Sequence, residues 1–198
     1  MKIYDISQEV FGCCVFPGDP APEKERLSSI ENGELYNLTA FSMCAHNGTH
    51  IDAPCHFVSG GVSVDAIPLE KTVGAAYVAG FDGTIGADDA RAILRRASEY
   101  GDDTAKRILI KGAATVSLEA AHVFAESGVY LVGNESQTVG PEEAPMTVHL
   151  ALLSAEVALL EGVRLREVPV GAYFLCAAPL SLGGSDGAPC RALLIADM

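Results

Sequence analysis

Residues 46–57 read His46-Asn47-Gly48-Thr49-His50-Ile51-Asp52-Ala53-Pro54-Cys55-His56-Phe57. This stretch holds three of the five histidines of the chain together with one aspartate. Imidazole nitrogens and a carboxylate oxygen suit a borderline divalent ion such as zinc, manganese or iron, whereas calcium and magnesium prefer oxygens alone. The stretch therefore predicts a metal site, and we expect the chain to be a metal-dependent hydrolase.

The spacing within this stretch indicates a turn that leads into a strand. His46 and His50 are four residues apart, as on one face of a helix, but Asn47-Gly48 between them disfavours a helix. In an extended segment side chains alternate, so His50 and Asp52 point to the same side, and the turn can bring His46 back toward them. Three ligands for one ion are then expected from a single short hairpin.

His56 lies beyond the bend at Pro54, close enough to face an ion without having to bind it. An imidazole with an unperturbed pKa of about 6.5 transfers protons in both directions near neutral pH. His56 is therefore a candidate general acid or base. The alternative interpretation is an irregular loop with structural histidines, but the clustering of three of only five histidines with an aspartate argues against it.

Two residues far along the chain add to the metal hypothesis. His149 lies near the start of a predicted helix, and Glu161 ends the apolar strand that follows it, just before Gly162. A carboxylate that closes a buried strand is costly unless it has a partner, and a metal ion is one such partner. A solvated strand end is the alternative interpretation of Glu161.

The composition favours one domain, residues 1–198, with a full hydrophobic core. The chain has 198 residues, of which 49% are hydrophobic. Its 26 acidic and 13 basic residues give a formal net charge of −13, which repels nucleic-acid phosphates and anionic membranes. No apolar run approaches the roughly 20 residues that span a bilayer, and residues 1–5 lack the pattern of a signal peptide. We expect a cytoplasmic protein without nucleic-acid or membrane partners.

The six cysteines are expected to be reduced thiols in apolar surroundings, because they form no Cys-x-x-Cys pair and show no even spacing. They are Cys13, Cys14, Cys44, Cys55, Cys176 and Cys190. Cys55 lies between Asp52 and His56, and a thiolate can ligate zinc. The sequence favours a place in the pocket wall for Cys55, since enough nitrogen and oxygen donors exist without it, but leaves the ligand role open.

Elements outside residues 46–57 alternate between strands and helices, which predicts a mixed α/β fold. Strands are expected at residues 75–81, 107–111, 129–132 and 157–160. Helices are expected at residues 87–100, between the capping residue Ser117 and Gly128, and at residues 146–154. His122 falls within the second helix and is expected to be an ordinary packed or surface histidine.

Residues 46–57 resemble the His-x-Gly-Thr-His-x-Asp-x-Pro-x-His signature of the cyclase family of metal-dependent hydrolases, which includes bacterial kynurenine formamidases and isatin hydrolases. The similarity extends over most of the chain. Further matching segments are Asp5-Ile6-Ser7, Phe16-Pro17-Gly18-Asp19, the pair His149 and Glu161, and the segment from Pro179-Leu180 to Gly187-Ala188-Pro189-Cys190-Arg191. The resemblance implies a swivelling β/β/α domain that assembles as a homodimer or homotetramer.

The resemblance also implies a role for each site residue. The implied metal ligands are His46, His50 and Asp52 for one ion and His149 for a second, with Asp52 and Glu161 bridging the two. The implied cofactor is one or two divalent ions, zinc first and manganese second. The ions would activate a water that attacks the carbonyl carbon of a small-molecule substrate. His56 would be the acid-base residue that protonates the leaving nitrogen, with Glu161 as a second catalytic residue that could steer it.

Two departures from the family pattern bear on the substrate. Phe16 stands where kynurenine formamidases usually carry tryptophan, and its smaller ring can still stack on an aryl group without an indole N–H donor. Residues 133–138, Gly-Asn-Glu-Ser-Gln-Thr, depart from the family's Gly-x-Asp-x-x-Ser pattern. Phe16 is therefore expected to bind substrate, while the contacts of the acyl group stay open.

The leading functional hypothesis is hydrolysis of an amide-type C–N bond, with an N-formyl aryl amide first and a cyclic amide, imide or lactone second. A different class of enzyme would use His46, His50 and Asp52 as a facial triad for Fe(II) and oxygen chemistry. That alternative leaves His149 and Glu161 without a role. A third alternative is a binding protein that keeps its metal and performs no chemistry.

Overall fold

A computed structural model describes residues 1–196 of the chain. Its strands are β1 (Lys2–Asp5), β2 (Glu23–Ser28), β3 (Leu38–Ser42), β4 (His50–Asp52), β5 (Val73–Gly80), β6 (Gly83–Ile85), β7 (Arg107–Lys111), β8 (Ala114–Val116), β9 (Leu131–Asn134), β10 (Ala158–Glu161), β11 (Gly171–Cys176), β12 (Gly187–Pro189) and β13 (Leu193–Ala196). Its α-helices are α1 (Ala87–Ser98), α2 (Leu118–Glu126) and α3 (Met146–Ser154). The predicted α/β class is confirmed.

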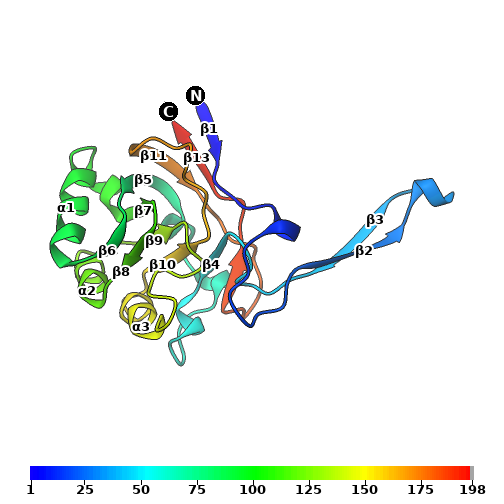
Figure 1. The fold of residues 1–198 in the computed structure, drawn as a ribbon, viewed down its shortest axis with the longest axis horizontal. Helices are drawn as coiled ribbons and strands as arrows, with labels where there is room; N and C mark the ends of the chain where they lie inside the picture. The colour runs from blue at the N-terminus through cyan, green and yellow to red at the C-terminus, as the bar shows by residue number, and fades with distance from the viewer. Residues whose placement is uncertain (197–198) are drawn as a thin grey trace.

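Within residues 1–196, nine strands form one curled sheet in the order β1-β13-β11-β5-β7-β9-β10-β4-β12. The central strands β5, β7, β9 and β10 run parallel, and the strands on both flanks are antiparallel. Strand β1 pairs with β13, so both ends of the described chain lie side by side (Figure 1). The antiparallel flank β10-β4-β12 carries the stretch that the sequence marked as a metal site.

The sheet separates two hydrophobic cores, because successive side chains of a strand point to opposite faces. On β7, Ile108 and Ile110 pack toward the helices, whereas Leu109 packs into the second core. Helices α1, α2 and α3 lie together on one face (Figure 1). On β4, Ile51 enters the second core, and its neighbours therefore face the helical side.

Most of the predicted elements are confirmed with small shifts at their ends. The strand at 107–111 and the helix at 146–154 match β7 and α3. The other predicted strands correspond to β5, β9 and β10, and the first predicted helix ends at Ser98 instead of residue 100. Ser117 caps α2 by accepting a hydrogen bond from the Ala120 N–H, as predicted.

Strands β2 and β3 form a two-stranded arm that projects from the body of the molecule (Figure 1). The two strands pair only with each other among the described elements, and their residues are exposed apart from the partly buried Ser28. The arm was not predicted from the sequence. Asn32-Gly33 does lie between the two strands, with Gly33 at a φ of +88°, but the connection spans residues 29–37 and is too long for the two-residue turn that marks a tight hairpin.

All six cysteines are free thiols. Five are partly buried, but Cys14 is exposed, so the expectation of apolar surroundings was wrong for that residue. Arg164 Nη2 lies 3.2 Å from its Sγ. Among residues 1–196, no helix combines the length and the hydropathy that a membrane crossing requires.

Candidate metal centre

The centre is built on the register of three antiparallel strands. Glu161 of β10 lies directly opposite His50 of β4, and Leu159 lies opposite Asp52. On the other side of β4, Gly187 of β12 lies opposite Asp52. Because directly opposed residues project from the same face of a sheet, Glu161 joins His50 and Asp52 on the helical side.

The turn before β4 brings His46 to the same face. Gly48 has a φ of +65°, and a Cβ there would lie 2.8 Å from Cys13 Cβ, so glycine is required on two grounds. The Thr49 hydroxyl donates to the Gly162 carbonyl at 2.8 Å, which ties the turn to the end of β10. Gln137 Nε2 donates to the carbonyls of His46 (3.4 Å) and Gly48 (3.2 Å). The turn is therefore anchored from two other segments.

Asp52 connects two groups of ligand atoms through its two carboxylate oxygens. Its Oδ1 lies 2.8 Å from His46 Nδ1 and 3.2 Å from His50 Nε2. Its Oδ2 lies 3.6 Å from His149 Nε2, which is 3.1 Å from Glu161 Oε1. The groups His46-His50-Asp52 and Asp52-His149-Glu161 each bring three ligand atoms within 4.8 Å of one another. The structure thus brings together all five residues that the sequence proposed as metal ligands.

Hydrogen bonds from the second ring nitrogen hold two of these histidines. Nδ1 of His50 donates to the Gly48 carbonyl at 3.0 Å, and Nδ1 of His149 donates to the Pro145 carbonyl at 2.9 Å. Each bond fixes the ring and turns Nε2 toward the carboxylates. Both imidazoles are therefore preorganised to present a nitrogen to a cation.

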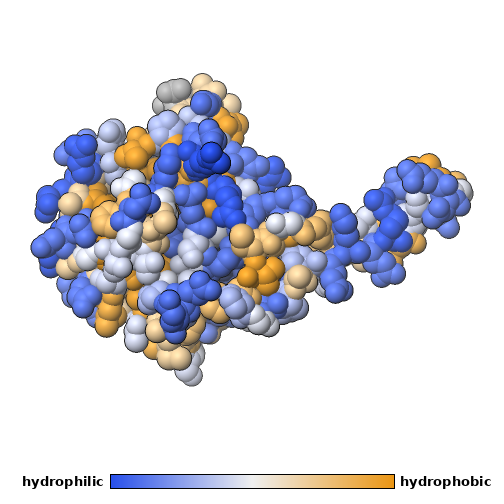
Figure 2. Space-filling view, in the orientation of Figure 1, coloured by the Kyte–Doolittle hydropathy of each residue, from blue (hydrophilic) through white to orange (hydrophobic). Residues whose placement is uncertain are grey.

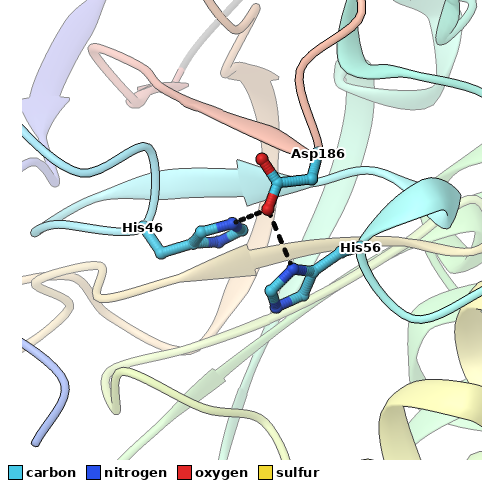
Figure 3. Close-up of side chains that lie close together, drawn as sticks. All are labelled: His46, His56 and Asp186. Carbon is cyan, nitrogen blue, oxygen red and sulfur yellow. Dashed lines mark hydrogen bonds and ion pairs between the residues drawn. The ribbon is translucent and has the colours of Figure 1, made fainter. Parts of the chain in front are cut away.

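Asp186 is a member of the site that our sequence analysis did not identify. Its Oδ2 accepts hydrogen bonds from His46 Nε2 at 2.9 Å and from His56 Nδ1 at 3.2 Å (Figure 3). The expectation that Glu161 steers His56 was wrong: the carboxylate on His56 belongs to Asp186, while Glu161 contacts His149, His50 and the Val139 N–H. The only sequence feature that could have indicated Asp186 is its place as the one acidic residue in the glycine-rich segment 183–187.

Burial and charge shift the pKa values in this cluster in opposite directions. Burial opposes protonation of His46, but Asp52 and Asp186 outweigh it and raise its pKa to about 10. Burial likewise opposes protonation of His149, but Asp52 and Glu161 raise its pKa to about 10. Burial would raise the pKa of Asp52, yet hydrogen bonds from three histidines hold it well below its usual value. Without a metal, protons on His46 and His149 supply the positive charge that these carboxylates need.

The remaining titratable members respond mainly to burial. Burial and the negative charge of Asp52 raise the pKa of Glu161. Burial lowers the pKa of His56 despite the nearby charges of Asp52 and Asp186, so its imidazole is neutral at pH 7. The His56 ring stacks on the His46 ring, with centroids 4.0 Å apart. A neutral imidazole beside the cluster can accept or pass on a proton.

A cavity of about 380 Å³ opens onto the cluster. Phe16, the expected substrate-binding residue, lines this cavity. Further lining residues that our sequence analysis did not assign to the site are Asp19, Cys44, Phe57, Gln137, Thr138, Pro145 and Asp186. The cavity combines a charged floor with aromatic walls, as small-molecule sites commonly do.

Two other residues lie outside the cluster. Cys55 Sγ donates to the Ser185 carbonyl at 3.6 Å and belongs to none of the ligand groups formed by residues 1–196. Burial and the charge of Asp186 raise the pKa of the Cys55 thiol, which disfavours thiolate ligation. Cys55 packs against the second core and is not among the residues that line the cavity, so its expected place in the pocket wall is not confirmed. His122 is exposed on α2, consistent with an ordinary surface histidine.

Comparisons with known proteins agree with this geometry. Residues 4–141 match the model of a family described as "Putative cyclase". Two relatives called kynurenine formamidase come from Salinibacter ruber and Erythrobacter litoralis. The first is 33% identical, and the alignment covers 98% of this chain and 97% of the relative. The second is 31% identical, and the alignment covers 98% of this chain and 93% of the relative.

Solved structures of related proteins have the same fold. A potential metal-dependent hydrolase with cyclase activity is 31% identical, covers 98% of this chain and 96% of its own, and has a TM-score of 0.80. Isatin hydrolase A from Labrenzia aggregata is 22% identical, covers 99% and 94%, and has a TM-score of 0.81. These matches confirm the cyclase-type fold that the resemblance implied.

The raised pKa values predict how pH affects the stability of the metal-free protein. The pKa values of His46 and His149 are about 10 in the folded chain and about 6.5 when unfolded. Their contribution is fully present below pH 6.5 and is lost as the pH rises toward 10. We expect the melting temperature of chelator-treated protein to fall between pH 6.5 and 9, by about 2–4 °C for each kcal/mol lost.

Calorimetry with and without zinc provides the measurement and its control. A metal ion takes the place of the protons on these nitrogens, so the zinc-loaded protein should not show the same fall. A metal-free melting temperature that stays flat across this range would contradict the assignment of protons to His46 and His149.

Proposed function

Because the chain belongs to the cyclase family, we propose that it is a metal-dependent hydrolase that cleaves an amide-type C–N bond, with an N-formyl aryl amide as its substrate. The kynurenine formamidases that it resembles at 31% and 33% identity over nearly the whole chain support this substrate class. The reaction releases formate and an aryl amine. A cyclic amide, imide or lactone is the alternative substrate, and it would open without losing a fragment.

One observation carries the proposal: the two oxygens of Asp52 face two different groups of ligands. Oδ1 faces His46 and His50, and Oδ2 faces His149. A buried carboxylate placed in this way is suited to bridge two cations. The mixture of imidazole nitrogens and carboxylate oxygens fits zinc or manganese, with zinc preferred for its affinity for imidazole.

The proposed ligands are His46, His50, Asp52, His149 and Glu161. A divalent metal in this centre would lower the pKa of a water molecule and polarise the substrate carbonyl. The buried carboxylates support metal binding further, because Asp52 and Glu161 are only 1% and 2% exposed and need positive charge beside them.

His56 is proposed as the acid-base residue. Its neutral imidazole lines the cavity, and Nδ1 is held by Asp186, which leaves Nε2 as the nitrogen that can exchange a proton with substrate. A neutral base near pH 7 can take a proton from the attacking water and return it to the leaving nitrogen. Glu161, proposed earlier as a second catalytic residue, contacts His149 and His50 and is better suited to hold the metal.

The cavity walls support an aryl substrate. Phe16 and Phe57 line it, and the Phe57 ring lies 4.5 Å from His56 and 4.9 Å from His149 between centroids. These faces can stack on an aromatic ring. The carboxylate of Asp19 also lies in the wall. It can form an ion pair with an ammonium group of the substrate, such as the amino group of an amino acid.

The proposal predicts metal-dependent release of formate from N-formylkynurenine. Chelation should abolish the release, and re-addition of zinc or manganese should restore it, because the bound metal would supply the activated water for attack on the carbonyl. Formate is measured by a coupled dehydrogenase assay, with isatin as a parallel substrate that yields no fragment. Ring opening of isatin without formate release would redirect the assignment to cyclic amides, and metal-independent formate release would contradict it.

Replacement of His56 tests the acid-base role. His56→Ala should lower kcat by about 10²–10⁴-fold, the usual contribution of a general acid or base, and should leave the metal content near that of the parent. Elemental analysis and steady-state kinetics provide the two readouts. His122→Ala, on the exposed face of α2, is the matched control. Loss of metal from His56→Ala would instead make His56 a ligand.

We further propose that the chain forms a homodimer through the β2–β3 arm. The arm exposes large apolar side chains, including Leu27 (55%), Leu35 (94%) and Phe41 (59%). An isolated two-stranded hairpin is marginally stable in water, and exposed apolar patches commonly mark protein interfaces. Figure 2 shows apolar residues at the tip of the arm and where it meets the body.

A hollow at the base of the arm offers a place for the arm of a second copy. It measures about 750 Å³ and is lined by residues that include Val10, Phe11, Met43 and Leu180. If each arm packs on the hollow of its partner, the two contacts are related by a two-fold axis and close a dimer. A homotetramer built from such dimers is the alternative assembly.

Light scattering tests the arm as the interface. The parent should elute with at least twice the chain mass of 20.7 kDa, and the double variant Leu27→Glu, Leu35→Glu should shift toward the monomer. Leu69→Glu changes an equally exposed leucine on the body, 60% exposed, and should leave the mass unchanged. A dimer that survives the double variant would place the interface elsewhere.

A further inference from the structure

The three proposed imidazole ligands differ in the group that accepts a hydrogen bond from the ring. Asp186 is the acceptor for His46, whereas main-chain carbonyls are the acceptors for the other two. The rings of His50 and His149 are held by the carbonyls of Gly48 and Pro145. His46 instead donates from Nε2 to Asp186 Oδ2 at 2.9 Å, across 140 positions of sequence. A hydrogen bond to a carboxylate is stronger than one to a neutral acceptor, so Asp186 polarises the His46 ring more than a carbonyl at the same distance would.

The same oxygen of Asp186 also holds His56. His56 Nδ1 lies 3.2 Å from Oδ2, and the two imidazole rings stack with an interplanar angle of 27°. Figure 3 shows the carboxylate reaching both rings from the loop before β12. A carboxylate oxygen has two lone pairs and can accept both hydrogen bonds at once.

The backbone around Asp186 fixes its position. Its carbonyl accepts a hydrogen bond from the Ala53 N–H at 2.9 Å. The next residue, Gly187 of β12, pairs with Asp52 of β4. A Cβ on Gly187 would lie 2.7 Å from His46 Cε1, so the strand passes directly beside the His46 ring. The side chain is half exposed, at 50%, yet its main chain is hydrogen-bonded to Ala53 and directly precedes β12 of the sheet that carries the centre.

We propose that Asp186 is a positioning residue that fixes both the metal ligand His46 and the acid-base residue His56. By accepting the Nε2 proton of His46, it leaves Nδ1 of that ring turned toward His50 and Asp52 to bind the cation. By accepting the Nδ1 proton of His56, it leaves Nε2 for proton exchange with substrate. This inference rests on the proposed function and adds a single residue through which metal affinity and proton transfer are linked.

Zinc affinity of substituted proteins tests the first half of the proposal without any substrate. Competition titration with a chromophoric chelator should show affinity for at least one zinc ion weakened about 10–100-fold in Asp186→Ala, the usual effect of removing a carboxylate behind a histidine ligand. Asp186→Asn keeps the shape and a neutral acceptor oxygen, and should fall between this variant and the parent.

Asp65→Asn is the matched control for loosening of the loop. Asp65 is exposed and accepts a hydrogen bond from the Gly184 N–H at 2.9 Å, two residues before Asp186 and outside the cluster. This variant should retain the zinc affinity of the parent. Equal weakening in Asp65→Asn would mean that loop order, and not the Asp186 carboxylate, sets affinity, and would overturn the proposal.

A double-mutant cycle with His56→Ala tests the second half. If Asp186 acts through His56, Asp186→Asn should lower kcat at saturating zinc in the parent background and should have little further effect when His56 is already alanine. Equal kcat losses in both backgrounds would overturn this half.

The remaining outcomes separate this inference from the proposed function. A parent chain that binds zinc while Asp186→Ala binds it equally well would overturn the inference alone. Loss of one whole zinc equivalent from both Asp186 variants would make Asp186 a direct ligand, which also overturns it. A parent chain that binds no divalent metal would overturn the proposed function and this inference together.

Discussion

The burial of two carboxylates side by side is the constraint on which the rest of the structure depends. Asp52 and Glu161 are almost fully inaccessible to solvent, and two unpaired charges in such surroundings would cost several kcal/mol each. His46, His50 and His149 surround them and supply positive charge, either as protons or by holding cations. Positive charge, from protons or from cations, therefore has to accompany this arrangement, which suits the centre to hold a divalent metal.

The sheet topology explains how side chains from distant segments meet around these carboxylates. The parallel strands β7, β9 and β10 carry the helices on one face, and α3 delivers His149 to that face. Strand β4 then adds antiparallel to β10 and places His50 opposite Glu161. Strand β12 closes the flank and brings Asp186 beside the turn that holds His46. Each ligand therefore lies on a regular element or on a turn tied to one, which favours a rigid geometry.

The arm is linked to the cavity through the chain itself. Asp19, in the cavity wall, precedes the start of β2 by four residues, and Cys44, also in the wall, follows the end of β3 by two. Anything that packs against the arm consequently acts on the two segments that form the outer wall of the cavity. A dimer formed through the arm, as proposed above, would couple assembly to substrate recognition for that reason.

The sequence by itself determined the α/β class, the turn and strand at residues 46–52 and the five residues proposed as ligands, because these follow from local spacing and from the family signature. Alternation along β4 sufficed to place His50 and Asp52 on one face. Only the tertiary structure decided that Asp186, and not Glu161, contacts His56, that Phe57 and Gln137 line the cavity, and that residues 23–42 leave the body as an arm. These features depend on strand register and on contacts between segments far apart in the chain, neither of which leaves a periodic signal in the local sequence.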